Sequence, residues 1–261
     1  MRVQLLATCL VDQLFPRVGL AAAAVLERCG VQVTVPPGQT CCGQPALNAG
    51  FTDEARRMAR HTIDVLAADD APVVVPSGSC TDMIVHHAPA LLAGEPSYAS
   101  RARAVAARTH ELSQFLVDVL KRPDCGACLA RSAAYHPSCH SLRALGVDRQ
   151  PRELLANVRG LERRALPNAE TCCGFGGLFA VKMSEVSGAM LERKIASIEE
   201  SGAETVIATD MSCLMHIAGG LRRKGSPVQV MHLAEVLAAT GGGVAASPKA
   251  AGAGPGKPKA E

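Results

Sequence analysis

"GQTCCGQPAL" (38–47) and "AETCCGFGGL" (169–178) each place two adjacent cysteines directly before a glycine. Two adjacent cysteines are awkward to join to each other, because a disulfide tolerates only a narrow geometry, and a packed core rarely needs both. A chain that carries the same pair twice calls for an explanation beyond packing. The spacing of the other cysteines supplies one.

The other cysteines repeat in the same register as the two pairs. The first half of the chain holds Cys9, Cys41, Cys42 and Cys80, and the second half holds Cys139, Cys172, Cys173 and Cys213. Corresponding cysteines are 130, 131, 131 and 133 residues apart. Farther along, "LSQFL" (112–116) corresponds to "LAEVL" (233–237) at an offset of only 121, which puts about twelve extra residues in the first half, around 92–106. Two copies of one ancestral unit explain this pattern.

Within each copy, predicted strands alternate with predicted helices. Short runs of strand-forming residues predict strands at 2–8, 31–35, 72–76, 133–136 and 205–209, and helical periodicity predicts helices at 52–68 and 179–200. The alternation predicts an α/β fold of two tandem, pseudo-symmetric domains, each built on a parallel sheet. We expect these domains at 1–130 and 131–240, followed by a disordered tail at 241–261 that is rich in Gly, Ala, Pro and Lys.

The composition excludes several classes of protein. The 261 residues carry a formal net charge of only +3 and no concentrated run of Lys or Arg in the body, which argues against nucleic acid as a partner. No uncharged apolar segment reaches the roughly 18 residues that span a bilayer, and the N-terminus lacks a signal-peptide cleavage site. We therefore expect a cytoplasmic protein without a membrane span. In that reducing compartment, eleven cysteines favour metal or redox use over a disulfide framework.

Each repeated cysteine follows the end of a predicted strand. Because the carboxyl ends of parallel strands meet at one edge of a sheet, we expect two clusters of four thiols, one in each half. Four thiols suit either Zn²⁺ or an iron–sulfur cluster. These two sites lack the close C-x₂₋₄-C pairs typical of zinc sites, and adjacent cysteines reach two metal atoms easily, so iron–sulfur is favoured. Helices predicted to begin just after Cys42, Cys80 and Cys213 would direct their positive ends at an anionic cluster.

These motifs also carry a family resemblance. The repeated Cys…Cys-Cys-Gly…Cys order, together with "YHPSCHSLRALG", "TCCGFGGLFAVKMSEVS" and "TDMSCLMHI", resembles the cysteine-rich CCG family. That family includes the cysteine-rich component of heterodisulfide reductase and the iron–sulfur component of glycolate oxidase, and the chain is most similar to its lactate-utilization branch. The resemblance covers residues 1–240.

The resemblance implies a cofactor, a function and partners. It implies one or two iron–sulfur clusters of the [4Fe–4S] type, held by the eight repeated cysteines. It also implies an electron-transfer component, rather than a self-sufficient enzyme, of a complex that oxidises L-lactate to pyruvate. Two other lactate-utilization proteins would be the partners, one of them an iron–sulfur protein of the ferredoxin type.

One departure from the family pattern bears on the chemistry. Full CCG domains end in C-x-x-C, whereas the first position of that motif is Ser77 in one half and Asp210 in the other, so each half has four cysteines. Four cysteines favour electron transfer over the thiol–disulfide chemistry of a heterodisulfide-reductase-like protein, which stays an alternative, as does a zinc-stabilised scaffold without redox activity. No G-x-G-x-x-G follows a strand, so we predict no NAD or FAD site.

The remaining cysteines and histidines have ordinary explanations. Cys29, at the end of an Ala-rich helix, is interpreted as a small buried hydrophobe. Cys125 and Cys128 form a C-x-x-C in a predicted loop between the repeats, and we interpret them as an exposed pair without a function. The histidines near the second cluster are His136, His140 and His216, which could tune a cluster or accept a proton, although capping or packing is the commoner role. His86 and His87 are expected to be solvated helix residues.

Overall fold

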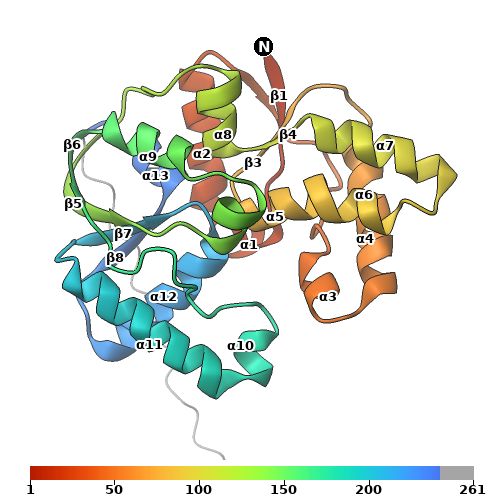
Figure 1. Ribbon diagram of the computed structural model, residues 1–261. Helices are drawn as coiled ribbons and strands as arrows, with labels where there is room; N and C mark the ends of the chain where they lie inside the picture. The colour runs from red at the N-terminus through yellow and green to blue at the C-terminus, as the bar shows by residue number, and fades with distance from the viewer. Residues whose placement is uncertain (242–261) are drawn as a thin grey trace, which may run out of the picture.

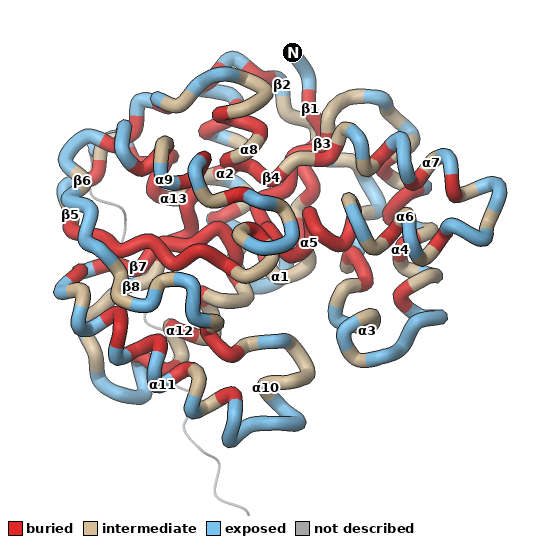
Figure 2. The backbone as a smooth tube through the Cα atoms, viewed as in Figure 1, coloured by how far each residue is buried: buried red, intermediate tan, exposed pale blue. Residues whose placement is uncertain are grey.

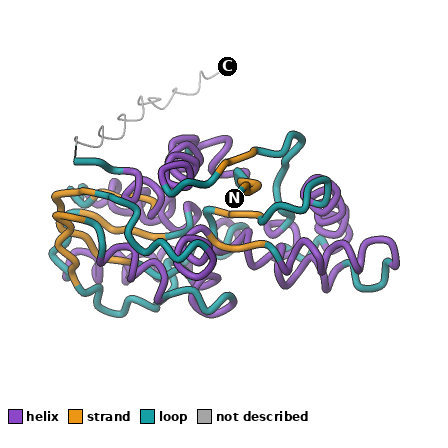
Figure 3. Tube along the Cα trace, turned by 90° about the horizontal axis from the view of Figure 1, so that it is seen from above, coloured by secondary structure: helices purple, strands orange, loops and turns teal. Residues whose placement is uncertain are grey.

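The computed structural model describes residues 1–241, so the predicted tail lies outside the described residues apart from Gly241. The described chain forms two four-stranded parallel sheets (Figures 1 and 3). The first contains β1 (Arg2–Leu5), β2 (Gln32–Thr34), β3 (Val73–Val75) and β4 (Thr109–Glu111), and the second contains β5 (Cys128–Tyr135), β6 (Arg159–Arg164), β7 (Thr205–Ala208) and β8 (Gln229–His232). Their orders, β2-β1-β3-β4 and β6-β5-β7-β8, are the same, which confirms the predicted α/β fold of two pseudo-symmetric halves.

Helices connect the strands in both halves. The first half has α1 (Cys9–Leu14), α2 (Pro16–Arg28), α3 (Gln44–Asn48), α4 (Thr52–Leu66), α5 (Gly78–Asp82), η1 (Met83–His87), α6 (Ala88–Leu91), α7 (Pro96–Ala107), α8 (Leu112–Gln114) and η2 (Phe115–Val119). The second half has η3 (His140–Ala144), α9 (Arg149–Ala156), α10 (Phe179–Lys182), α11 (Ser184–Glu200), α12 (Met211–Lys224) and α13 (Leu233–Ala238). The η segments are single π-helical turns.

The positions of these elements agree with most of the predicted ones. The extra residues of the first half form α7, which has no counterpart between β7 and β8. The helix predicted at 179–200 is broken at Met183 into α10 and α11. The helix predicted at 52–68 is α4, which begins at Thr52 and ends at Leu66. The strands β4, β6 and β8 were not predicted, because they are short or, like the Arg- and Glu-rich β6, mostly exposed.

Alternating side chains of the strands divide the interior into three buried layers. In β3, Val74 belongs to a core that contains residues of both halves, whereas Val73 and Val75 point to a second core against α4 and α6. In β7, Ile207 faces the shared core and Val206 faces a third core against α11 and α12. The buried backbone of β5 and β7 runs through this interior (Figure 2). The two halves therefore stabilise each other through a common layer.

The halves also meet closely beyond the carboxyl ends of their sheets. Gly78, the first residue of α5, lies against Ser141 of η3, and a Cβ atom on Gly78 would lie 2.1 Å from the Ser141 Oγ and 3.0 Å from its backbone nitrogen. The Ser141 hydroxyl is itself held by Thr209 at 3.0 Å and by Ser138 at 2.9 Å. Only glycine allows this approach.

We expect the substitution Gly78→Ala to lower the free energy of unfolding by about 1 to 3 kcal/mol, because the added methyl group must push the two halves apart. Chemical denaturation measures this. Gly219→Ala is the matched control, since Gly219 lies inside α12 with open space around it and should leave stability unchanged or raise it by up to about 1 kcal/mol. Equal effects of the two substitutions would contradict the close contact.

Candidate metal centres

The four repeated cysteines of the first half meet beyond the carboxyl ends of β1, β2 and β3. Cys9 begins α1, Cys41 and Cys42 lie between β2 and α3, and Cys80 lies in α5. The Sγ atoms of Cys42 and Cys80 are 3.4 Å apart, and the Cys41 thiol interacts with those of Cys9 and Cys42. The predicted convergence therefore takes place, and the four thiols form one continuous group.

The second half repeats this arrangement residue for residue. The Cys172 thiol interacts with those of Cys139 and Cys173, and the Cys173 thiol with that of Cys213. The backbone N–H of Gly174 donates a hydrogen bond to the Cys172 Sγ at 3.3 Å. A backbone N–H directed at a thiol sulfur stabilises the thiolate form that binds metal.

The helices next to the cysteines begin earlier than predicted at two places. α3 does begin shortly after Cys42, but α5 begins two residues before Cys80 and α12 two residues before Cys213. The reason is local capping, since Ser77 is the N-cap of α5 and its hydroxyl accepts a hydrogen bond from the Cys80 N–H at 3.3 Å. Cys80 and Cys213 therefore lie inside the first helical turns.

The glycine after each cysteine pair is required by the backbone. Gly43 and Gly174 have φ values of +95° and +89°, in the left-handed region that side chains disfavour. A Cβ atom on Gly174 would also lie 2.7 Å from the carbonyl oxygen of Ser187 in α11. These turns bring each pair against the following long helix, which explains the recurrence of glycine at this position.

The crowding of thiols changes how readily each one loses its proton. Hydrogen bonds lower the pKa of Cys41 to about 2, chiefly from Cys42, and that of Cys172 to about 2, chiefly from Cys139. The pKa values of Cys42 and Cys173 are raised, because these thiols donate hydrogen bonds to Cys41 and Cys172 and are buried. The hydrogen bonds thus favour the thiolate form of Cys41 and of Cys172, and a bound cation would favour release of the remaining protons. This donor set fits either Zn²⁺ or an iron–sulfur cluster.

Among the described residues, the histidine that lies next to two of the repeated thiols is His136, in the second half. His136 is 0% exposed, and its ring offers a nitrogen within 4.8 Å of the Sγ atoms of Cys173 and Cys213. His216, which was also expected here, lies with its Nε2 3.4 Å from the Ser187 hydroxyl and its ring against Phe175. Of the two, His136 is the one with a nitrogen close to two thiols.

His140 turns away from the second group toward the first half. Its Nδ1 lies 2.8 Å from the Asp82 carboxylate, and its Nε2 lies 3.2 Å from the Gln44 amide nitrogen. Asp82 also binds the Nδ1 of His86 at 2.7 Å and lies 3.4 Å from the Nε2 of His87. His140 was placed near the second cluster with capping or packing as its commoner role, and in the structure its side chain bridges the two halves.

A buried lysine also distinguishes the second half. Lys194 of α11 is 0% exposed, and its ammonium donates hydrogen bonds to the carbonyl oxygens of Asn168 and Ala169, both at 3.0 Å. Burial lowers the pKa of Lys194, while attraction to the four thiols of this half opposes that shift. The sequence analysis missed this residue, although a lysine on an otherwise apolar helix face is a visible signal.

The cysteines outside the repeat are arranged differently from the prediction. Cys125 is buried rather than exposed, and its thiol contacts that of Cys29, so both belong to the shared core. Cys128 begins β5. The interpretation of Cys125 and Cys128 as an exposed loop pair is wrong, because residues far apart in sequence fold over this segment. Cys29 is buried, as predicted.

The two positions that lack the fifth cysteine of a CCG domain contact each other. The Asp210 carboxylate accepts hydrogen bonds from the backbone N–H of Ser79 at 2.8 Å, from the Ser79 hydroxyl at 3.1 Å and from the Ser77 hydroxyl at 3.3 Å. The Ser212 hydroxyl donates to the same carboxylate at 3.0 Å. Ser77, Ser79 and Asp210 are all buried. These positions thus connect the halves.

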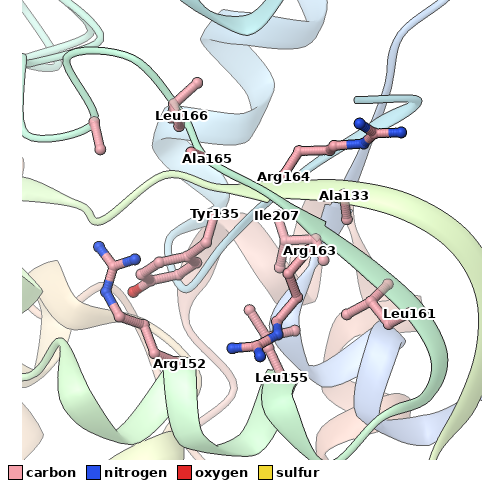
Figure 4. Close-up of a pocket in the computed structure, with 11 residues that line it drawn as sticks. Ala133, Tyr135, Arg152, Leu155, Leu161, Arg163, Arg164, Ala165, Leu166 and Ile207 are labelled. Carbon is pink, nitrogen blue, oxygen red and sulfur yellow. The ribbon is translucent and has the colours of Figure 1, made fainter. Parts of the chain in front are cut away.

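A cavity of about 250 Å³ lies apart from the thiol groups, between β5, β6 and α9 (Figure 4). Its polar lining consists of Tyr135, Arg152, Arg163 and Arg164, and the Arg152 guanidinium lies 5.2 Å from the centre of the Tyr135 ring. None of the eight repeated cysteines is among the described residues that line it. The cavity does not extend the candidate metal centres.

Comparison with known proteins agrees with this architecture. The model of a cysteine-rich domain family, CCG, matches residues 3–85 and 133–218, one match in each half. Lactate utilization protein A of Geobacillus sp. (strain WCH70) is 49% identical over 237 residues, which are 91% of this chain and 99% of that protein. Lactate utilization protein A of Exiguobacterium sp. (strain ATCC BAA-1283 / AT1b) is 50% identical over 236 residues, 90% of this chain and 96% of that protein. The chain therefore belongs to the cysteine-rich CCG proteins and, among them, to the lactate utilization protein A family.

Among the helices of the described residues, none is both long enough and apolar enough to cross a bilayer.

We expect Asp210→Ala to lower the free energy of unfolding by about 1 to 3 kcal/mol, because the buried Ser79 N–H loses its acceptor. Urea denaturation of parent and variant at equal metal content measures the difference. Ser212→Ala serves as the control, since it removes one hydrogen bond from the same carboxylate at a less buried position and should cost about 1 kcal/mol or less. A loss no larger for Asp210→Ala than for the control would show that the connection between the halves does not depend on this carboxylate.

Proposed function

We propose that the protein is the iron–sulfur electron-transfer component of a complex that oxidises L-lactate to pyruvate. The observation that carries the proposal is the pair of matching four-thiol groups in a chain that belongs to the lactate utilization protein A family. The ligands are Cys9, Cys41, Cys42 and Cys80 in the first half and Cys139, Cys172, Cys173 and Cys213 in the second. A [4Fe–4S] cluster in each half would supply the redox chemistry.

The arrangement of the thiols supports iron–sulfur over zinc. In each group, the adjacent pair lies in the middle of a row of four thiols, so its two sulfurs have different neighbours. A cluster of several metal atoms uses such an extended row better than one tetrahedral ion does. The N–H of Gly174 directed at Cys172 supports the same conclusion, since hydrogen bonds to sulfur tune cluster potentials.

The number of groups also suits the reaction. Oxidation of lactate to pyruvate releases two electrons and two protons, whereas an iron–sulfur cluster passes electrons one at a time. Two clusters in one chain would hold both electrons of a turnover. The alternative, disulfide reduction of the heterodisulfide-reductase kind, finds less support, because Ser77 and Asp210 are engaged in connecting the halves.

The proposal includes partners and a location. The chain acts in the cytoplasm with two other lactate-utilization proteins, one of them an iron–sulfur protein of the ferredoxin type. The lactate site belongs to the complex and is not assigned to this chain. Nucleic acid is not a partner.

We expect Cys80→Ser to remove roughly half of the iron from the anaerobically purified protein, because the first cluster loses one of its thiolates. Cys213→Ser should do the same for the second cluster. Iron and acid-labile sulfide per chain measure both. Cys29→Ser is a matched control, since Cys29 and Cys80 are each 8% exposed but only Cys80 belongs to a thiol group. Unchanged iron in Cys80→Ser would overturn the ligand assignment, and zinc in place of iron would support the scaffold alternative.

We further expect L-lactate to reduce the clusters when the protein is mixed with its two partner proteins under anaerobic conditions. Loss of the visible cluster absorption upon addition of L-lactate, with pyruvate formed in proportion, measures the transfer. D-lactate is the control for the substrate, and a mixture without this chain is the control for the relay. Equal pyruvate formation with and without this chain would contradict a role in electron transfer.

A further inference from the structure

The second thiol group contains a candidate metal donor that the first group lacks. His136 directly follows β5 and precedes Cys139 by three residues. Its side chain is 0% exposed, and one ring nitrogen and the Sγ atoms of Cys173 and Cys213 all lie within 4.8 Å of one another. Donors that bind one metal atom at about 2.0 to 2.3 Å stand at most about 4.6 Å apart. Small shifts would therefore bring these three to a common metal.

The imidazole of His136 has one polar neighbour among the described residues, the thiol of Cys213. Apart from this interaction, neither Nδ1 nor Nε2 has a hydrogen-bond partner there. A buried polar group without a good partner is destabilising, and such groups are rare unless a bound species satisfies them. A metal between the ring and the two thiols would provide that partner.

The position that corresponds to His136 in the first half has no donor side chain. The offset that superposes Cys139 on Cys9 places Leu6 at the position of His136. Leu6 is 3% exposed and packs in the same core as Cys42 and Cys80. The corresponding position of the first half thus offers packing and no donor atom.

We propose that His136 is a ligand of the metal centre in the second half, so that the two centres differ: thiolates alone in the first, thiolates and an imidazole in the second. This inference rests on the proposed function in that both place metal at the second group. It adds a named residue and a difference between the centres.

The surroundings of the second thiol group also distinguish it from the first, because they would raise the reduction potential of a cluster bound there. Lys194 places a buried ammonium in electrostatic contact with all four thiols of this half. Buried residues of α4 and α11 correspond at an offset of 132, which places Thr62 at the position of Lys194. The nearby ammonium favours the reduced, more negative cluster. His136 joins the four thiolates as a neutral fifth ligand and so removes no negative charge, unlike the imidazoles that replace thiolates in Rieske-type clusters. The second centre therefore has the higher reduction potential, and electrons pass from the first centre to the second.

The test uses the whole protein, purified anaerobically from cells grown on ¹⁵N-histidine and reduced chemically. Pulsed EPR should detect a ¹⁵N coupling of the strength of a directly bonded nitrogen. The coupling should be lost in His136→Gln and retained in His216→Gln, the matched control, because His216 also lies beside the second group. A redox titration should show two midpoints, of which only the higher shifts in His136→Gln.

The labelled parent protein decides the question even if His136→Gln does not fold. A reduced, iron-containing parent without a bonded-nitrogen coupling would overturn the inference and leave the proposed function intact, as would a coupling that survives in a folded His136→Gln variant. A protein that binds no iron would overturn the proposed function instead. The same pulsed EPR measurement on protein loaded with Co²⁺ then tests His136 separately, and absence of the bonded-nitrogen coupling there also overturns the inference.

Discussion

The buried carboxylate of Asp210 joins the two halves by hydrogen bonds and links the segments that carry Cys80 and Cys213. Asp210 occupies the N-cap position of α12, the helix that carries Cys213. Apart from the Ser212 hydroxyl, the groups that donate hydrogen bonds to its carboxylate belong to the other half, and none is a backbone N–H of its own helix. The strongest of these comes from the backbone N–H of Ser79, next to Cys80. Because the carboxylate and the N–H are both buried, neither can exchange its partner for water. The positions of Cys80 and Cys213 are thereby linked.

This link also provides a connection between the centres. Cys80 is bonded to Ser79, Ser79 donates its N–H to Asp210, and Asp210 is separated from Cys213 by two residues. A path of covalent bonds with a single hydrogen bond therefore joins one thiol group to the other. A cysteine at either Ser77 or Asp210 would have placed a fifth thiol there and removed part of the connection. The residues that stand in place of the fifth cysteine, Ser77 and Asp210, are therefore the same residues that join the halves.

The sequence predicted the repeat, the parallel sheets and the convergence of the cysteines, because a shared offset and the direction of parallel strands leave few alternatives. It did not predict β6, whose residues "RGLERR" carry no apolar alternation, or the burial of Cys125, which depends on contact with Cys29 across 96 residues. His136 was named, but an isolated histidine has no pattern of its own. An alignment of the two copies distinguishes His136, because the corresponding residue of the first copy is the apolar Leu6.

The differences between the copies follow a consistent rule. Glu111 and His232 correspond at the offset of 121, both are wholly buried, and both cap the helix after the last strand by accepting backbone hydrogen bonds. Burial raises the pKa of Glu111 to about 7 and lowers that of His232, so each side chain is biased toward its neutral form. The capping role is kept while the chemical group changes. The second copy has His136 where the first has Leu6. Packing does not explain this difference, since leucine packs well at the corresponding position of the first copy. A buried imidazole there, in contact with the Cys213 thiol, agrees with the metal ligation proposed for that group.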